Sequence, residues 1–519
     1  MKEIQRVLLI AMLSVNFLLA QSVTHKNHIS IKAFEKSIDI TYKEINQDTI
    51  FNSKSCNRYI SDITGFLLQE SGNKLLPLTS SDFKDLKKRG DKITKKLFLF
   101  RLRLREKLQK FYFQGTISTG CVNSIRRAFR YSRFIEEFIT ETLVAIDKKP
   151  IKANPCNLCK NKRQFFLQPK YKNFQFKSGD IIIVRNSSFV SAIISRIGDE
   201  DGQFSHAAML YIDKKGKKFI LESLISKGAV IVPFKEWKRH NLHSRVVLYR
   251  YTNPNVAKNA AKRLHQFIEK SHKKKYTVLY NFKMIPSHNE FYCSELVQYG
   301  YRLAGIKHLP TFPTSFHIIS NHPFLKDLTI EAMKAFSPND VEVEPSVDLV
   351  AEWRNYDLTR ESRIEDVIQT KVLQWMSHRA YLLVETIKSN LGASIGIVGR
   401  HLFGFKHDEL PLNMPYGFLD NIIKIYDLDL ILKKHLDKKE EEYFDKYHHS
   451  MDYLTMMNVL EKFRLEDCNR YIRRHEEMKD RILSHFGDWE KPWLTPEPLF
   501  HSIFNTANKI QCNDPIGDR

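Results

Sequence analysis

The chain has 519 residues, of which 42% are hydrophobic and 27% are charged, and its formal net charge is +23. This length allows two or three domains, and the composition is globular rather than disordered or collagen-like. The charge has two interpretations: lysine-rich solvated faces, or attraction to an anionic polymer or surface. The sequence carries no signature of a nucleic-acid-binding domain, so we expect no nucleic-acid partner.

The N-terminus predicts export. Lys2 and Arg6 precede a mostly apolar run over 7–20, and polar residues follow it. This is the pattern of a secretory signal peptide, and the run is too short for a comfortable membrane span. We expect cleavage after Ala20 and a periplasmic or secreted mature protein. An uncleaved anchor is the alternative, because Leu18 is large for its place two positions before the cleavage site.

Helical periodicity dominates the next region, up to about residue 147. The longest helical segment, 82–113, is rich in lysine and arginine and has an apolar stripe. The stripe comprises Leu86, Ile93, Leu97, Phe100, Leu104 and Leu108. Such a stripe packs a helical bundle or, as the alternative, lies on a membrane surface. Prolines then mark a linker, so we expect a signal peptide over 1–20 and a helical domain with its linker over 21–165. Further helical segments are expected at 35–45, 55–69 and 124–146.

Short β-rich runs separated by turn signals begin after residue 174. The expected strands are 180–184, 206–212, 218–223, 229–232 and 245–251, and the expected helices that follow are 256–271 and 293–303. We therefore predict an α+β domain over 166–325, in which a mainly antiparallel sheet meets a helix that begins at a cysteine. The pattern beyond Pro323 is helical again, so we expect a helical C-terminal domain over 326–519. Its clearest helices are expected at 363–389, 419–433 and 451–486.

The chain has seven cysteines, so an exported protein would keep at least one thiol unpaired. We expect the free one to be Cys293. The lone CxxC motif at 156–159 has no second pair, so it does not predict a zinc site. We find no metal ligands elsewhere. Two conceivable disulfides, whose connectivity the sequence does not decide, are Cys56–Cys121 and Cys468–Cys512.

His206 and Cys293 have the local settings that a thiol hydrolase needs. His206 begins an apolar run that is typical of a strand, and Cys293 begins a predicted helix. A thiol attacks only as the thiolate, and its pKa is lowered both by a neighbouring imidazole and by the partial positive charge of a helix N-terminus. We predict Cys293 as the nucleophile and His206 as the base. A core histidine and an inert buried cysteine are the alternatives for each residue alone.

Three more residues complete the predicted site. A hairpin between the two strands after residue 205 brings Glu222 near His206, where its carboxylate would stabilise the protonated imidazole. The alternative for Glu222 is a solvent-exposed carboxylate at a strand end. The backbone N–H groups of Cys293 and Ser294 would bind a developing oxyanion. Tyr292 would shape the pocket or donate from its hydroxyl, with plain aromatic packing as the alternative.

Four motifs follow one another along this part of the chain. They are Ser178-Gly179-Asp180-Ile181-Ile182, Phe204-Ser205-His206-Ala207-Ala208-Met209, Leu221-Glu222 and Tyr292-Cys293-Ser294-Glu295-Leu296-Val297. In this order the motifs resemble the circularly permuted NlpC-type papain-like hydrolases, and most of all the YiiX/YaeF-like amidase group. The resemblance covers less than a third of the chain.

The resemblance implies a fold and a site. In that family the histidine precedes the cysteine, and the nucleophile helix packs on a small barrel-like sheet. It implies Cys293 as nucleophile, His206 as base and Glu222 as the polar third member. It also implies that Asp180 closes a turn beside the site rather than acting chemically.

These predictions point to an exported cysteine hydrolase that opens an amide bond through a thioacyl intermediate and needs no cofactor. The expected partner is peptidoglycan or another anionic component of the cell envelope. One alternative is a lipid acyl hydrolase or acyltransferase with the same site, in which the 82–113 segment contacts a membrane surface. The other is a non-catalytic binding protein on the same fold.

Overall fold

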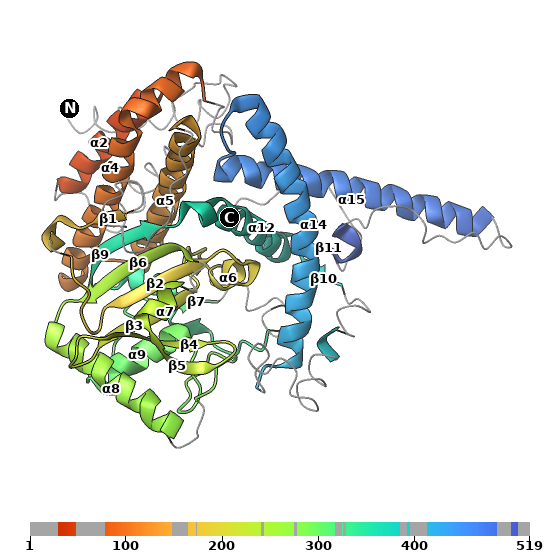
Figure 1. The fold of residues 1–519 in the computed structure, drawn as a ribbon. Coiled ribbons are helices and arrows are strands. Elements are labelled where there is room, and N and C mark those ends of the chain that lie inside the picture. Colours follow the sequence, from red (N-terminus) through yellow and green to blue (C-terminus); the bar gives the residue numbers. More distant parts are fainter. Residues whose placement is uncertain are drawn as a thin grey trace, which may run out of the picture.

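A seven-stranded antiparallel sheet forms the centre of the molecule, in the order β1-β9-β6-β2-β3-β4-β5 (Figure 1). The computed structural model describes residues 30–47, 78–147, 165–172, 174–239, 243–273, 278–316, 324, 328–384, 392–394, 413–484 and 500–506. The strands of the sheet are β1 (Phe165–Leu167), β2 (Ile181–Asn186), β3 (His206–Ile212), β4 (Lys218–Leu224), β5 (Gly228–Pro233), β6 (His243–Tyr251) and β9 (Val347–Arg354).

The sheet is open, so the implied barrel-like closure is wrong. A barrel requires the first and last strands of the sheet to pair with each other. Here β1 pairs only with β9 and β5 pairs only with β4 among the described strands, which leaves both at the edges. The antiparallel arrangement and the mixed helix-and-sheet class are confirmed.

Helices cover both faces of the sheet, which explains why its strands are apolar at consecutive positions. On one face, Ile181 and Ile183 pack in the same core as α8 (Pro254–Lys273) and α9 (Cys293–Leu303). On the other face, Ile182 and Val184 share a core with α7 (Phe234–Arg239). A short helix, α6 (Phe189–Ile194), follows β2. Helix α9 and strand β3 begin at the predicted residues, Cys293 and His206.

Strand β9 is a part of the sheet that the sequence pattern did not predict. It pairs with β1 on one side and with β6 on the other, so the sheet extends beyond residue 325. Two small sheets, also not predicted, pair β7 (Thr314–Ser315) with β8 (Lys334–Ala335) and β10 (Tyr381–Leu383) with β11 (Phe504–Thr506). A 3-10 helix, η3 (Pro338–Val343), lies between β8 and β9. Shorter 3-10 turns lie at Pro169–Tyr171 and Phe500–Ser502.

The N-terminal helices α2 (Ile31–Asn46), α4 (Ser80–Phe113) and α5 (Thr119–Asp147) pack together beside the sheet (Figure 1). All six apolar residues of the predicted α4 stripe are at most 2% exposed. The stripe therefore packs a core, and it is not available as the apolar face of a membrane contact. The predicted signal peptide over 1–20 and the predicted helix over 55–69 lie outside the described residues.

The C-terminal region contains the long helices α12 (Tyr356–Arg379), α14 (Tyr416–Tyr447) and α15 (Tyr453–Ser484). Helix α12 ends ten residues before the predicted end at 389, because Ala380 is left-handed and the next residues pair with β11. Of the helices in the described part of the chain, none combines the length and the apolar character that crossing a bilayer needs.

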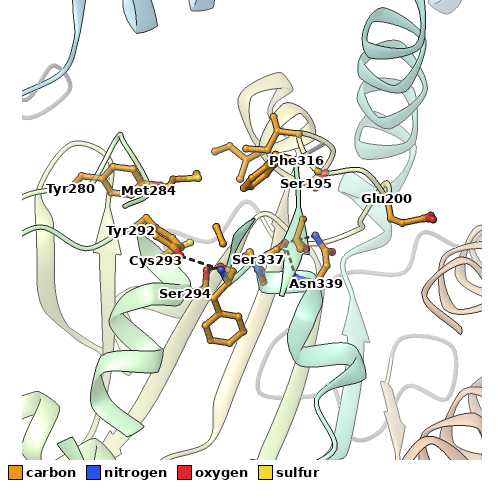
Figure 2. A pocket seen from close by; sticks show the side chains of 17 residues that line it. Ser195, Glu200, Tyr280, Met284, Tyr292, Cys293, Ser294, Phe316, Ser337 and Asn339 are labelled. Atoms are coloured by element: carbon orange, nitrogen blue, oxygen red, sulfur yellow. Dashed lines mark hydrogen bonds between the residues drawn. The ribbon is translucent and has the colours of Figure 1, made fainter. Parts of the chain in front are cut away.

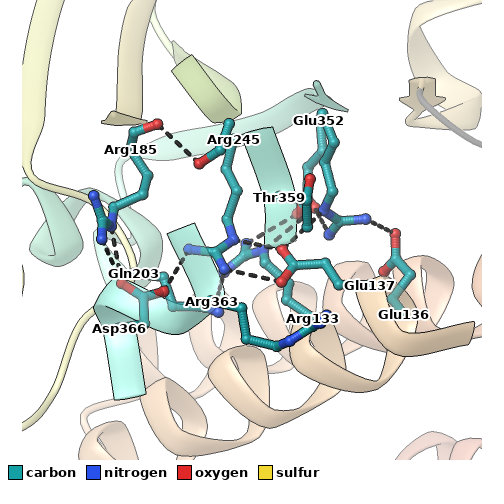
Figure 3. Close-up of polar contacts among 12 residues, drawn as sticks. Arg133, Glu136, Glu137, Arg185, Gln203, Arg245, Glu352, Thr359, Arg363 and Asp366 are labelled. Atoms are coloured by element: carbon teal, nitrogen blue, oxygen red, sulfur yellow. Dashed lines mark hydrogen bonds and ion pairs between the residues drawn. The ribbon is translucent and has the colours of Figure 1, made fainter. Parts of the chain in front are cut away.

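A buried network of ion pairs joins these helices to the sheet (Figure 3). Glu352 on β9 lies 3.0 Å from Arg133 of α5 and 2.9 Å from Arg101 of α4. Asp366 on α12 lies 2.7 Å from Arg185 of β2 and 2.8 Å from Arg245 of β6. These side chains are at most 2% exposed. The network therefore fixes α4, α5 and α12 against the sheet that carries the histidine.

Cys293 is the free cysteine among the described residues, as predicted. Cys121 and Cys468 are each disulfide-bonded. Their predicted partners, Cys56 and Cys512, lie outside the described residues.

Candidate active site

Cys293 is the first residue of α9, which directs its thiol to the N-terminal end of the helix. The preceding residue, Tyr292, is extended and forms the N-cap. The first N–H groups of a helix have no partner within it, so they are available near the thiol. Cys293 is 4% exposed, and its Sγ lies 4.0 Å from the carbonyl oxygen of Ser205, the residue before His206.

The β3–β4 hairpin brings Glu222 to His206, as the sequence predicts. Met209 pairs with Leu221, and continuing this register places Glu222 diagonally across from His206 on the same face. Glu222 Oε2 lies 2.8 Å from His206 Nε2. The carboxylate is buried, which excludes the alternative of a solvent-exposed strand-end residue. Because Nε2 is bound to Glu222, Nδ1 is the ring nitrogen left for Cys293.

Burial and pairing have opposite effects on the pKa values of Cys293 and His206. Burial alone would lower the pKa of His206, but hydrogen bonds to Cys293 and Glu222 raise it to about 10. Burial alone would raise the pKa of the Cys293 thiol, but the imidazole and the backbone N–H groups of Ala207 and Ser294 lower it. The arrangement therefore favours a thiolate–imidazolium pair, which is the reactive form of a cysteine nucleophile.

A mainly apolar pocket opens at the thiol, and we call it the thiol pocket (Figure 2). Its apolar lining residues are Ile194, Ile197, Tyr280, Met284, Tyr292, Phe316, Ala335, Phe336 and Pro338. Its polar lining comes from Ser195, Glu200, Cys293, Ser294, Thr314, Ser337 and Asn339. Figure 2 shows Tyr280 and Met284 on one side of Cys293, with Ser337 and Asn339 on the other. The pocket suits an apolar group attached to the carbonyl that the thiol attacks.

The segment 336–339 crosses between the helix of the cysteine and the strand of the histidine. The Tyr292 hydroxyl accepts a hydrogen bond from the N–H of Phe336 at 3.1 Å, and the Ser294 hydroxyl donates to the Phe336 carbonyl. The Asn339 Oδ1 accepts from the N–H groups of Gln203 and Phe204, at 2.8 and 2.9 Å. Tyr292 and Ser294 thus hold this segment through their side chains.

Sequence reasoning missed Asn339, and no local pattern pointed to it. Its side chain is bound to backbone atoms more than a hundred residues earlier in the chain, and those atoms lie next to the strand of His206. A contact of this kind depends on the tertiary fold. The Ser205 carbonyl near the thiol and the Tyr280 wall of the pocket were missed for the same reason.

Asp180 lies away from the thiol, so its place beside the site is not observed. It precedes β2 at the end where Ile181 pairs with Met209, whereas His206 pairs with the other end of β2 at Val184. The Asp180 carboxylate accepts hydrogen bonds from the Lys177 N–H at 2.8 Å and from Arg250 Nε at 2.7 Å. Asp180 therefore closes the turn before β2. Within the described part of the chain, no cluster of histidine, cysteine, aspartate and glutamate is placed to hold a metal ion.

Comparison with known proteins agrees with this geometry. Residues 175–350 match the family model of the permuted papain-like amidase enzymes, YaeF/YiiX, C92 family. A crystal structure of the metalloprotein yiiX from Escherichia coli O157:H7 is 21% identical over 35% of this chain and 100% of that chain. Its TM-score of 0.26 is too low to support a structural argument. No curated protein matches the chain. Residues 175–350, which carry Cys293, His206 and Glu222, are thus similar to the permuted papain-like amidases, and this similarity suggests a cysteine hydrolase acting on amides.

Proposed function

We propose that this protein is an exported cysteine amidase or endopeptidase that opens an amide bond in cell-wall peptides. The observation that carries the proposal is the arrangement of three side chains. Cys293 begins a helix, its thiol pKa is lowered by His206, and Glu222 holds the imidazole at 2.8 Å. A nucleophile, a proton shuttle and an orienting carboxylate are the parts that acyl transfer to a thiol requires.

In the proposed mechanism the Cys293 thiolate attacks the amide carbon. The N–H groups at the start of α9 stabilise the oxyanion that forms on the carbonyl oxygen. As the C–N bond breaks, His206 donates its Nδ1 proton to the leaving amine, and a thioacyl enzyme remains. The now neutral imidazole takes a proton from water, which attacks the thioester. The carboxylic acid leaves, and the thiolate–imidazolium pair is restored.

Two observations support an extracytoplasmic site of action. Cys121 and Cys468 are disulfide-bonded, and disulfides persist mainly in oxidising compartments. The net charge of +23 favours retention on an anionic wall. Together with the signal-like N-terminus, these features support the periplasm or the outside of the cell.

A second candidate function is a lipid acyl hydrolase or acyltransferase with the same catalytic residues. The observation that favours it is the apolar lining of the thiol pocket, which includes Ile194, Ile197 and Phe316. These residues would pack against the first carbons of a fatty acyl group next to the carbonyl, and the rest of the chain would lie outside the pocket. The proposed chemistry at Cys293 is unchanged, and only the acyl donor differs.

The first experiment is alkylation of Cys293 by iodoacetamide as a function of pH, in the wild type and in His206→Ala. We expect rapid alkylation near neutral pH in the wild type, and we expect its loss in the variant. His265→Ala is the matched control, because His265 lies on α8 against Tyr211 rather than in the site. Alkylation that rises only above about pH 8.5, the value of a free thiol, and is unchanged in His206→Ala would refute the proposal in favour of a non-catalytic binding protein.

Substrate assays then separate the two enzymatic candidates. An amidase of the cell wall releases soluble muropeptide fragments from purified sacculi. A lipid acyl hydrolase releases fatty acid from phospholipid vesicles instead. Cys293→Ala serves as the inactive control in both assays.

A further inference from the structure

A second pocket adjoins the thiol pocket, and we call it the polar pocket. The two pockets share four lining residues, namely Met284, Tyr292, Ala335 and Phe336. The other residues of the polar pocket are Tyr112, Pro286, Glu295, Gln298, Lys307, His308, Leu309, Pro310, Thr311, Pro313 and Lys334. The two pockets therefore adjoin, so a substrate molecule that spans these four residues would contact both.

Two lysines give the polar pocket a chemical character that the thiol pocket lacks. Lys307 and Lys334 are exposed, and neither side chain has an ion-pair or hydrogen-bond partner among the described residues. Other lysines nearby are paired, such as Lys283, which lies 2.8 Å from Glu331. The charges of Lys307 and Lys334 are thus available to a ligand.

The acidic residue of this lining, Glu295, offsets these charges only in part. It is 4% exposed, and its carboxylate accepts hydrogen bonds from Asn281 Nδ2 at 3.1 Å and from the Tyr292 N–H at 3.4 Å. Burial raises the pKa of Glu295 to about 7, so at neutral pH the carboxyl is charged only part of the time. The pocket therefore carries a net positive charge at neutral pH.

We propose that the polar pocket binds an anionic group, a carboxylate or a phosphate, on the same substrate molecule whose amide Cys293 attacks. This inference rests on the proposed function. With the carbonyl at the thiol and an apolar group in the thiol pocket, the anionic group extends past Tyr292 toward Lys307 and Lys334. The substrate class is thus an amide with an apolar acyl side and an anionic group a short distance from the scissile bond.

The test uses three iodoacetamide probes with the same short spacer, ending in a carboxylate, a phosphate or a neutral carboxamide. Each probe forms an S–C bond with Cys293 and releases iodide, so no natural substrate is needed. We expect an anionic probe to alkylate the wild type faster than the neutral probe. The anionic end group that gives the larger rate identifies the ligand as a carboxylate or a phosphate.

Variants locate the effect. Lys307→Met and Lys334→Met are each expected to reduce the ratio of anionic to neutral rates by about two- to fivefold, as for an exposed ion pair. Salt at 1 M should bring the wild-type ratio close to one. The matched control is Lys214→Met. Lys214 lies in the turn between β3 and β4, beyond the end of β3 that is farther from His206. This variant should leave the ratio unchanged.

The outcomes separate the two proposals. Equal rates for all three probes in the wild type, or a ratio that both lysine variants leave unchanged, would overturn the polar pocket while the reactive thiol still supports the amidase. No reaction of Cys293 with any probe at neutral pH would overturn the proposed function itself. The rate with the neutral probe also reports whether each variant has kept its folded site.

Discussion

Two buried clusters of ionisable side chains in this protein owe their charges to different causes. In the ion-pair network, burial alone would raise the pKa of Asp366, but Arg185, Arg196 and Arg245 together lower it. In the active site, burial likewise opposes a charge on Cys293 and on His206. There, the pKa shift that favours each charge comes in part from the other member of the pair. The network is enclosed between helices and sheet, whereas the site opens to the thiol pocket.

The difference lies in what each charge depends on. A guanidinium stays protonated at any physiological pH, so the network charges are permanent, and their role is to hold α5 and α12 on the sheet. The thiolate and the imidazolium exist because each stabilises the other, and formation of the thioacyl enzyme consumes both charges. The permanent charges of the ion-pair network thus hold the helices on the sheet. The charges of Cys293 and His206, which depend on each other, carry out the proposed chemistry.

Removing the nucleophile should have the largest effect. Cys293→Ala eliminates the thiolate–imidazolium pair, and we expect the rate of hydrolysis of an amide substrate to fall by about 10⁴-fold or more. The free energy of unfolding, measured in urea, should change by only about 1 kcal/mol because the substitution removes one small buried group. Residual activity within tenfold of the wild type would place the nucleophile elsewhere.

Breaking the permanent network should reduce stability rather than chemistry. Asp366→Ala leaves Arg185, Arg196 and Arg245 without their shared carboxylate, and we expect the free energy of unfolding to fall by about 3–5 kcal/mol. The matched control is Glu269→Ala, which removes a 3.0 Å pair with Lys273 at the surface and should leave the melting temperature unchanged. A similar loss in both variants would show that the network has no special role.

Neutralising the orienting carboxylate should weaken the pair without removing it. In Glu222→Gln, we expect kcat/KM to fall by about 10²-fold. The wild-type pair exists above the lowered pKa of the thiol and below the His206 pKa of about 10. Losing the Glu222 charge lowers the pKa of His206, and the less stable imidazolium raises that of the thiol. The rise of alkylation with pH should therefore shift to higher pH, because the thiolate forms later. The alkaline fall of kcat/KM should shift to lower pH, because His206 must be protonated to donate to the leaving amine. If neither profile shifts, a role for Glu222 is excluded.

The smallest effect is expected from the segment that joins helix and strand. Asn339→Ala removes the side chain that holds Gln203 and Phe204, and we expect alkylation of Cys293 at neutral pH to slow by about tenfold, or about 1.4 kcal/mol. Asn413→Ala is the control, since it removes a 2.8 Å hydrogen bond to the Tyr280 carbonyl without touching the strand of the histidine. Equal slowing in both variants would assign Asn339 a general packing role.

Local patterns predicted the parts of the fold that carry the proposed site. The strand at His206 and the helix at Cys293 begin where the sequence indicates, and the α4 stripe is buried as a helical period requires. Strand β9 was missed because its pairing partners, β1 and β6, are distant in the chain and no turn signal links it to either. The open edges of the sheet depend on the same long-range pairing.

What the sequence by itself determined is the identity and local setting of the reactive groups: a thiol at a helix start, a histidine at a strand start and a carboxylate one hairpin away. Periodicity, turn residues and helix starts are encoded within a few neighbouring residues. Only the tertiary structure decided how these groups are held, through Asn339, the network around Asp366 and the walls of the two pockets. Such contacts join residues far apart in the chain, so their free energy depends on the packed fold rather than on any local pattern.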